Sequence, residues 1–204
     1  MDCPQDPVGR DRQREETRRR VYLAALEIFR RDGFATCRID DIAKLAAVSR
    51  GTFYFHFPTK VDVLVQRLRE AECGVVKKLN AMPAGTRLAQ VLDTTANAIA
   101  DAWQGESKLV LDVAATGMRL AADALDREAE PVRAALTPFF RAAAERGELA
   151  DLLPPEALTD FYLVNTLAAM VAWGGNPKLE LRMMLQGVST LFMTGAQGKA
   201  RPGA

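Results

Sequence analysis

The chain of 204 residues is long enough for one large or two small domains, each with its own core. Apolar residues make up 49% of it and charged residues 26%, which is typical of a soluble helical protein. The net charge of +1 hides an asymmetry, because residues 1–82 carry 16 Lys and Arg against 12 Asp and Glu. A basic N-terminal part favours a local surface for a polyanion, although ordinary surface scatter would also give this excess.

The cysteines and the chain start exclude several other classes. Cys3, Cys37 and Cys73 are odd in number and widely spaced, so we expect neither a disulfide framework nor a zinc site, and no cofactor. Asp2 and Asp6 argue against a signal peptide, and no apolar run approaches the ~18–20 residues that a membrane span requires. These features predict a cytoplasmic protein.

Helical periodicity recurs along the chain and no window alternates at period two, which predicts an all-α fold. We expect a mobile arm to residue 12, then a helix over 13–31 that Gly33 stops. Two short helices follow, and a further helix to about residue 79 begins at a capping-box pair, Thr59 and Asp62.

The clearest break in the chain is the segment 80–85, where we expect a domain boundary. Beyond it, helices are predicted over 86–103, 107–122, 131–146, 155–173 and 179–194, with a bend at Pro138. The predicted organisation is an N-terminal helical domain at 13–60, a connecting helix at 61–80 and a C-terminal helical domain at 81–196.

The segment 39–57, IDDIAKLAAVSRGTFYFHF, is the most informative part of the sequence. Ile42 and Ala43 share the inward face of a short helix, and Val48 lies in a three-residue apolar turn. Ser49 then provides an N-cap for a second short helix. This arrangement predicts a helix-turn-helix, which carries its second helix into the major groove of DNA.

The residues that follow the cap divide into core and contact positions. Phe53 and Phe57, four residues apart, are predicted to face the core. Arg50 can fork onto guanine and Thr52 can contact a thymine methyl group, while Gly51 lets the backbone approach closely. The remaining candidate contacts, all to phosphate, are Tyr54, His56 and Lys60. His56 is the only histidine, so a structural or surface role is its alternative.

Residues 17–34, followed by IDDIA, VSRGTFYFHF and Lys60, resemble the DNA-binding domain of the TetR family of transcriptional regulators. The resemblance implies that residues 49–55 form the recognition helix. It also implies that the C-terminal domain senses a small molecule and dimerises through its last two helices. Two positions depart from the family pattern. Ala47 replaces the usual turn glycine, and Cys37-Arg38 follows where a threonine is favoured, so that Arg38 could reach a phosphate instead.

The C-terminal helices support dimerisation by themselves. The segment 155–173 is apolar almost all round, and 179–194 has an apolar stripe in which Gly187 would permit close approach. A symmetric four-helix interface is the preferred interpretation and a role in the core alone is the alternative. Candidate ligand-pocket residues are Trp103, Asp112, Thr116, Met118, Phe139, Phe140, Tyr162 and Asn165.

The sequence therefore predicts a homodimeric, non-enzymatic regulator that binds double-stranded DNA and has no membrane partner. We expect a repressor that a small apolar or amphipathic ligand releases from a palindromic operator. The alternative is a DNA-binding regulator without a small-molecule ligand, controlled by a partner protein or by its abundance. A helical enzyme with a borrowed DNA-binding domain has no support from any catalytic motif.

Overall fold

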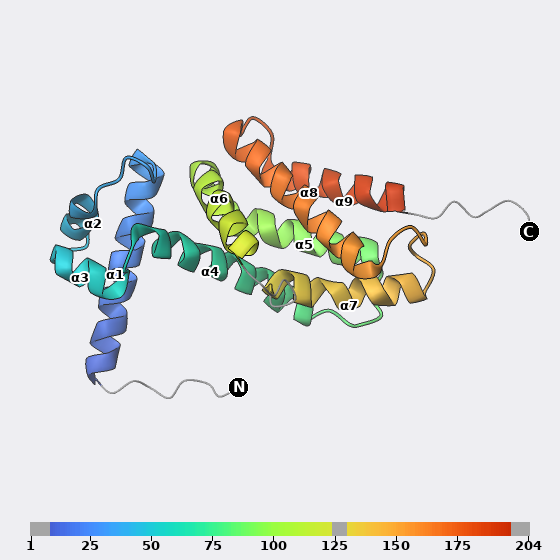
Figure 1. Ribbon diagram of the computed structural model, residues 1–204, viewed down its shortest axis with the longest axis horizontal. Helices are drawn as coiled ribbons and strands as arrows, with labels where there is room; N and C mark the ends of the chain where they lie inside the picture. Colours follow the sequence, from blue (N-terminus) through green and yellow to red (C-terminus); the bar gives the residue numbers. More distant parts are fainter. Residues whose placement is uncertain (1–8, 124–129, 197–204) are drawn as a thin grey trace, which may run out of the picture. The chain divides into compact units, whose positions relative to one another are not determined.

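The computed structural model describes residues 9–123 and 130–196, with the backbone alone at residues 10 and 118–123. These residues form nine α-helices and no strand, so the predicted all-α fold is confirmed (Figure 1). The helices are α1 Gly9–Asp32, α2 Ile39–Leu45, α3 Arg50–His56, α4 Lys60–Asn80, α5 Leu88–Trp103, α6 Ser107–Asp123, α7 Pro131–Glu145, α8 Pro155–Gly175 and α9 Leu181–Ala196.

The first helix begins earlier than the sequence indicated. Residues 9–12 were expected to belong to a mobile arm, but they form the first turn of α1, and only residues 1–8 of that arm lie outside the described chain. Asp11 lies in the first turn, where a carboxylate is favourable, and Arg12 Nε pairs with Glu16 Oε1 at 3.3 Å one turn later. Local charge thus extends the helix beyond its apolar stripe.

The described chain divides into two compact units, residues 1–66 and 67–204, and the division falls inside α4. The break at 80–85 therefore separates α4 from α5 within the second unit, and does not mark the boundary between packed units. The predicted connecting helix at 61–80 is present as part of one continuous helix, α4.

The first unit packs α1, α2 and α3 around aromatic side chains. Phe53 and Phe57 are fully buried, as predicted, with ring centroids 6.1 Å apart. Phe57 also stacks on Tyr22 of α1 at 6.3 Å. Because both phenylalanines come from the region of α3, this core fixes which side of α3 remains exposed.

The turn between α2 and α3 depends on a left-handed residue. Ala47 has φ +51°, the one positive φ outside glycine among the described residues. The Val48 N–H bonds to Ala43 O at 2.9 Å and the Ala47 N–H to Lys44 O at 3.2 Å. These are the two bonds of a Schellman motif, in which glycine usually takes the left-handed position. The turn therefore has the geometry of a Schellman motif with an alanine at the left-handed position.

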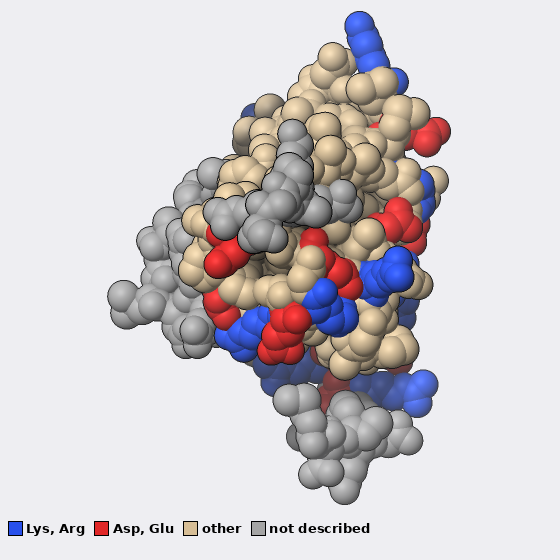
Figure 2. All heavy atoms as spheres, turned by 90° about the vertical axis from the view of Figure 1, so that its right-hand side faces the viewer, with Lys and Arg blue, Asp and Glu red and all other residues tan. Residues whose placement is uncertain are grey.

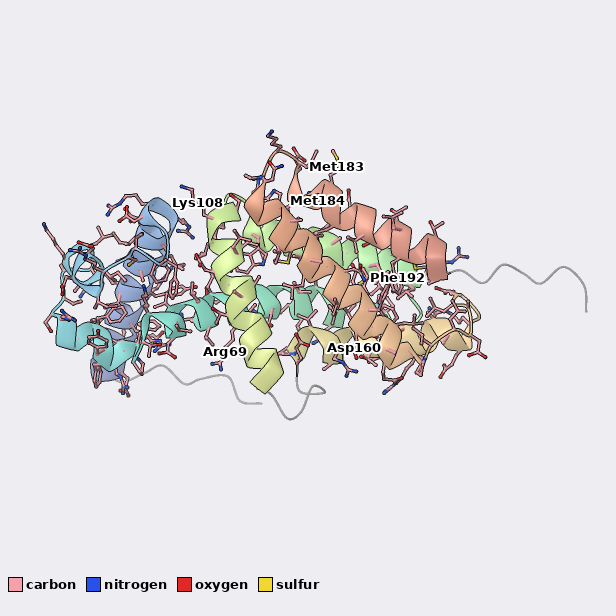
Figure 3. The ribbon with its side chains drawn as sticks, turned by 45° about the horizontal axis from the view of Figure 1, so that its top comes forward. Arg69, Lys108, Asp160, Met183, Met184 and Phe192 are labelled. Carbon is pink, nitrogen blue, oxygen red and sulfur yellow. The ribbon has the colours of Figure 1, made fainter. Side chains whose placement is uncertain are left out.

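The second unit packs α5 against α9, and α8 against α6, α7 and α9. An aromatic cluster of Phe140, Tyr162 and Phe192 lies in its interior, with Phe192 of α9 turned toward α8 (Figure 3). The Tyr162 hydroxyl is buried with Ser189 Oγ at 3.1 Å and Leu92 O at 3.3 Å. Burial raises the pKa of this phenol.

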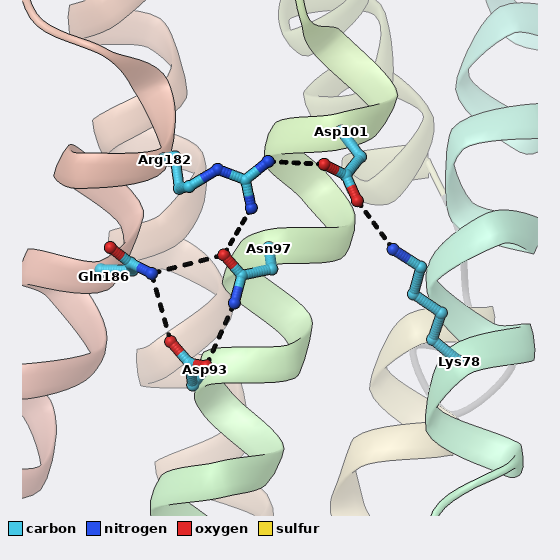
Figure 4. Close-up of polar contacts among 6 residues, drawn as sticks. All are labelled: Lys78, Asp93, Asn97, Asp101, Arg182 and Gln186. Carbon is cyan, nitrogen blue, oxygen red and sulfur yellow. Dashed lines mark hydrogen bonds and ion pairs between the residues drawn. The ribbon is translucent and has the colours of Figure 1, made fainter.

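A polar network holds α9 on α5 (Figure 4). Arg182 donates to Asn97 Oδ1 and to Asp101 Oδ1, both at 2.6 Å. Lys78 of α4 donates to the second oxygen of Asp101 at 2.8 Å, and these hydrogen bonds lower the pKa of Asp101. Gln186, one turn after Arg182, also reaches Asn97 Oδ1. The network sets the rotation of α9 and leaves its opposite side outward.

The positive φ of Ala47 predicts that this residue strains the turn. Ala47→Gly should stabilise the first unit by about 1 kcal/mol, because glycine adopts positive φ without the clash of a Cβ atom. The amides of α2 and α3 should then exchange with solvent about fivefold more slowly. Ala46→Gly is the matched control, because Ala46 is right-handed at φ −76° and buried, so glycine there should destabilise. Faster exchange in Ala47→Gly would contradict the proposed strain.

Candidate nucleic-acid interface

Helix α3, the expected recognition helix, begins at a fully formed cap. Ser49 is extended at φ −76° and ψ 158°, and its Oγ accepts from the Thr52 N–H at 3.0 Å. The two hydroxyls, Ser49 Oγ and Thr52 Oγ1, lie 2.9 Å apart. The predicted N-cap is therefore confirmed. Thr52 can present its methyl group outward while its hydroxyl bonds the cap.

Arg50, the expected base reader, is exposed at the start of α3 and bound to α2. Its Nη1 lies 3.3 Å from both carboxylate oxygens of Asp40. Hydrogen bonding to Tyr54 and the charge of Asp40 raise the pKa of Arg50. An ion pair this exposed is worth little in water, so a DNA base or phosphate can displace Asp40. The carboxylate holds the guanidinium extended across the helix-turn-helix.

Gly51 is not required by the fold. A Cβ atom added there would meet only Ser49 Oγ, at an ordinary contact distance of 3.7 Å. The residue is exposed and its φ is not positive. The absence of a side chain therefore serves no contact within the described chain, which fits the expected close approach of another molecule.

His56 faces a groove and not open solvent. The groove, of about 440 Å³, is lined by Asp11, Arg14, Glu15, Arg18, Phe55 and His56. Arg18 Nη1 donates to the His56 carbonyl at 2.9 Å, and Arg14 lies over the exposed Phe55 ring. Burial, with the nearby charges of Arg18 and Arg14, lowers the pKa of His56. The imidazole is therefore neutral at pH 7 and can donate one N–H.

Lys60 points back into its own unit. Its Nζ donates to Phe34 O at 2.7 Å and lies 3.4 Å from Ala35 O and Cys37 O. The ammonium also lies 4.5 Å from the centre of the Phe34 ring. The expected phosphate contact would compete with all of these interactions.

The two residues before α2 have opposite surroundings. Cys37 is buried and its pKa is raised by burial, so it belongs to the core. Arg38 is the N-cap residue of α2, is exposed, and makes no side-chain capping bond. The departure at Cys37-Arg38 thus leaves a cation, and no capping hydroxyl, at this edge of α2.

The candidate residues fall into two groups. Exposed or half-buried on α2, the turn and α3 are Arg38, Ser49, Arg50, Gly51, Thr52 and Tyr54. His56 is instead buried at the groove, and the Lys60 ammonium is bonded to the carbonyl of Phe34. The sequence did not predict Asp40 as part of this surface, because its pairing with Arg50 crosses the turn.

The expected ligand-pocket residues do not gather at one place. Trp103 lies under the Arg67 guanidinium, 4.2 Å from ring centre to Cζ, at the end of α5. Tyr162 of α8 contacts Leu92 of α5. Leu92 lies eleven residues before Trp103 on α5, which is ~16 Å along the helix axis. Phe139 and Phe140 are buried, and Phe140 lies beside Tyr162. Trp103 is thus separated from the aromatic cluster.

The polar candidates of the pocket bond to their own helices. Thr116 is buried and donates to Asp112 O at 2.8 Å, and Asn165 donates to Phe161 O at 2.7 Å. The side chain of Met118 lies outside the described residues.

Across 9–123 and 130–196, no cluster of His, Cys, Asp or Glu could hold a metal, and no helix is long and apolar enough to cross a membrane.

Comparison with known proteins places the interface in a family. Residues 22–66 match the family model of bacterial regulatory proteins of the tetR family. Similar proteins include the HTH-type transcriptional regulator SrpR of Pseudomonas putida, 48% identical over 50 residues, which are 24% of each chain. EthR of Mycolicibacterium smegmatis is 34% identical over 82 residues, 38% of this chain and 36% of that one. The chain thus spans about a quarter to a third of the length of these curated relatives.

The fold extends the likeness beyond the matched residues. The structure of Thermus thermophilus FadR, a TetR family transcriptional repressor in complex with lauroyl-CoA, covers 92% of this chain and 100% of its own. Its TM-score is 0.63 at 24% identity, which shows a common fold. Residues 22–66 therefore match the tetR family of bacterial regulatory proteins, and most of the chain shares its fold with a regulator of that family.

Proposed function

We propose that this chain is a cytoplasmic transcriptional repressor that binds a palindromic DNA operator as a homodimer. One observation carries the DNA-binding part. Helix α3 bears the exposed Arg50, an exposed glycine that the fold does not require, and the half-buried Thr52. Arginine reads guanine, threonine reads the thymine methyl group, and the absence of a Cβ atom permits close backbone approach.

The proposed contacts divide by role. Arg50 and Thr52 read base edges, with Gly51 between them. The expected phosphate contacts come from Arg38, Ser49, Tyr54 and His56, and such contacts fix the orientation of α3 without reading sequence. The role of Lys60 is argued below.

Selection of duplexes from random DNA tests the function. The wild-type chain should enrich a two-fold symmetric sequence with half-sites about one helical turn apart. Gly51→Ala should fold at least as well, because alanine favours helix, yet bind the selected duplex at least tenfold more weakly. Binding is measured by fluorescence anisotropy, and folding by circular dichroism. Equal affinity of the two proteins would contradict the proposed role of Gly51. If the selection enriches no sequence, the proposed function is wrong.

The ion pair between Asp40 and Arg50 makes a second prediction. Asp40→Asn should strengthen binding to duplexes of any sequence by roughly 3- to 10-fold at low salt, because a carboxylate that competes with DNA for Arg50 is removed. The gain should shrink as salt rises.

Asp41→Asn provides the matched control, since Asp41 is also exposed on α2 and has the same charge. Its gain should be smaller, because among the described residues Arg50 is paired with Asp40 and not with Asp41. Equal gains in titrations of the two variants would show that net charge, and not release of Arg50, is responsible.

Dimerisation is supported by an apolar face on α8 and α9. Phe161 and Val164 of α8 are 58% and 65% exposed, and Leu191 of α9 is 75% exposed. Met183 points outward at the start of α9 (Figure 3), and a Cβ atom on Gly187 would meet no atom within 4 Å. In the upper part of Figure 2, where Figure 1 places α8 and α9, charged side chains are sparse.

This face suits a second copy of the chain. Exposed apolar surface on two adjacent helices is costly in water, and a two-fold axis would bury it in a four-helix interface. A dimer also supplies the second recognition helix that a palindromic site requires.

Leu191→Glu should therefore convert the dimer to a monomer at micromolar concentration, since each copy would bury a carboxylate in the interface. Sedimentation velocity measures the outcome. Leu23→Glu is the control, because Leu23 is 51% exposed on α1 in the first unit, and it should remain dimeric. A monomeric wild-type protein, or a dimeric Leu191→Glu variant, would contradict the proposed interface.

We further propose that a small apolar or amphipathic ligand releases the repressor. The support is the helical second unit and its fold likeness to a repressor solved with lauroyl-CoA. Of the candidate residues, Phe140 and Tyr162 lie together, the Tyr162 hydroxyl is buried beside Ser189, and Asn165 is on the same helix as Tyr162. Repeating the DNA selection with a metabolite extract shows whether an effector exists.

A further inference from the structure

We propose that Lys60 is a positioning residue for DNA binding. Its ammonium fastens the turn between α1 and α2, which presents Arg38, and it makes no contact with the DNA backbone. The proposal rests on the proposed function, because the placement of Arg38 matters only if the chain binds DNA.

The contacts of Lys60 account for its donor groups. An ammonium has three N–H donors, and three carbonyl oxygens surround it, those of Phe34, Ala35 and Cys37 at 2.7, 3.4 and 3.4 Å. The Phe34 ring lies 4.5 Å away, within the range of a cation–π interaction. An ammonium directed at a phosphate would give up these partners, so the geometry favours an internal role.

The turn needs such a cation. It follows the end of α1 at Asp32, where helix carbonyls carry partial negative charge. Its own backbone bonds are few, with the Gly33 N–H on Phe29 O at 2.9 Å and the Cys37 N–H on Gly33 O at 3.2 Å. The carbonyls of residues 34 and 35 therefore depend on Lys60, which comes from the first residue of α4.

The anchored residues run directly into Arg38. Cys37, the last of them, is buried, and Arg38 follows it as the exposed N-cap residue of α2. The beginning of α2 lacks a side-chain cap, so local bonds do little to fix it. By contrast, α3 is fixed by its own turn and by Phe53 and Phe57. Release of Lys60 should therefore misplace Arg38 and spare Arg50.

A double-mutant cycle separates positioning from direct contact. The variants are Lys60→Met, which keeps most of the side-chain stem, Arg38→Met, and both together. Each single variant should weaken binding to the duplex selected by the wild-type chain by roughly 5- to 20-fold, and the double variant should be no more than twofold weaker than either. The slope of log affinity against log salt should fall by ~0.9 in all three.

Direct phosphate contact by Lys60 predicts a different result. The fold-changes would then multiply in the double variant and its salt slope would fall by ~1.8. That outcome overturns the proposal, as does an Arg38→Met variant that binds like wild type. Lys44→Met, which alters an exposed lysine on α2 without touching the turn, should leave the effect of Arg38→Met at full size.

Amide hydrogen exchange tests the anchor without DNA. In Lys60→Met the amides of residues 35–38 should exchange at least tenfold faster, while those of Phe53 and Phe57 keep their wild-type rates. Uniform acceleration would indicate a loss of global stability, and no change would indicate no anchor, and either overturns the proposal. If no duplex is ever selected, the proposed function fails, whereas this exchange experiment still decides whether Lys60 holds the turn.

Discussion

The left-handed backbone at Ala47 is the constraint on which the interface depends. It reverses the chain between α2 and α3, and the next residues, Val48 and Ser49, complete the turn with one backbone bond and one cap. The direction in which α3 leaves the turn is thus set by three consecutive residues. Every side chain on α3 inherits that direction, because a helix of seven residues is rigid over its length. A clash at the Cβ atom of Ala47 is tolerated because the bonds on either side and the aromatic core over-determine the conformation.

Several cationic side chains of this surface already bind groups within the chain. Asp40 holds Arg50, three carbonyls hold Lys60, and the His56 carbonyl and Gln66 hold Arg18. Arg50 and Lys60 nevertheless differ. The carboxylate on Arg50 is exposed and easily displaced, so this cation is available to another partner. The partners of Lys60 are backbone oxygens of a partly buried turn, so displacement would cost local structure. A lysine that the sequence suggests for phosphate contact can thus stabilise the local backbone instead.

Local features were predictable from the sequence and long-range ones were not. Helical periodicity located all nine described helices, and the Ser49 cap and the capping box of Thr59 and Asp62 are present as expected. These depend on residues three or four apart. The partners of Lys60 lie 23 to 26 residues away, and Asp40 reaches Arg50 across a turn, so no spacing rule indicates either. The ligand-pocket prediction shows the same limit. Buried aromatic residues were identified, but their separation along α5 depends on how the helices pack.

Helix α4 carries two cationic side chains that each bind several groups of neighbouring elements, Lys60 and Arg67. Lys60 begins it, and Arg67 lies seven residues on, or ~10 Å along the axis. The Arg67 guanidinium is buried over Trp103, pairs with Glu106 Oε2 at 3.0 Å and bonds to Ala102 O. A buried ion pair often contributes no more to folding stability than an apolar pair of similar size. This pair does, however, specify one arrangement of α4 against the α5–α6 connection. The Arg67 contacts therefore fix α4 to the α5–α6 connection within the second unit.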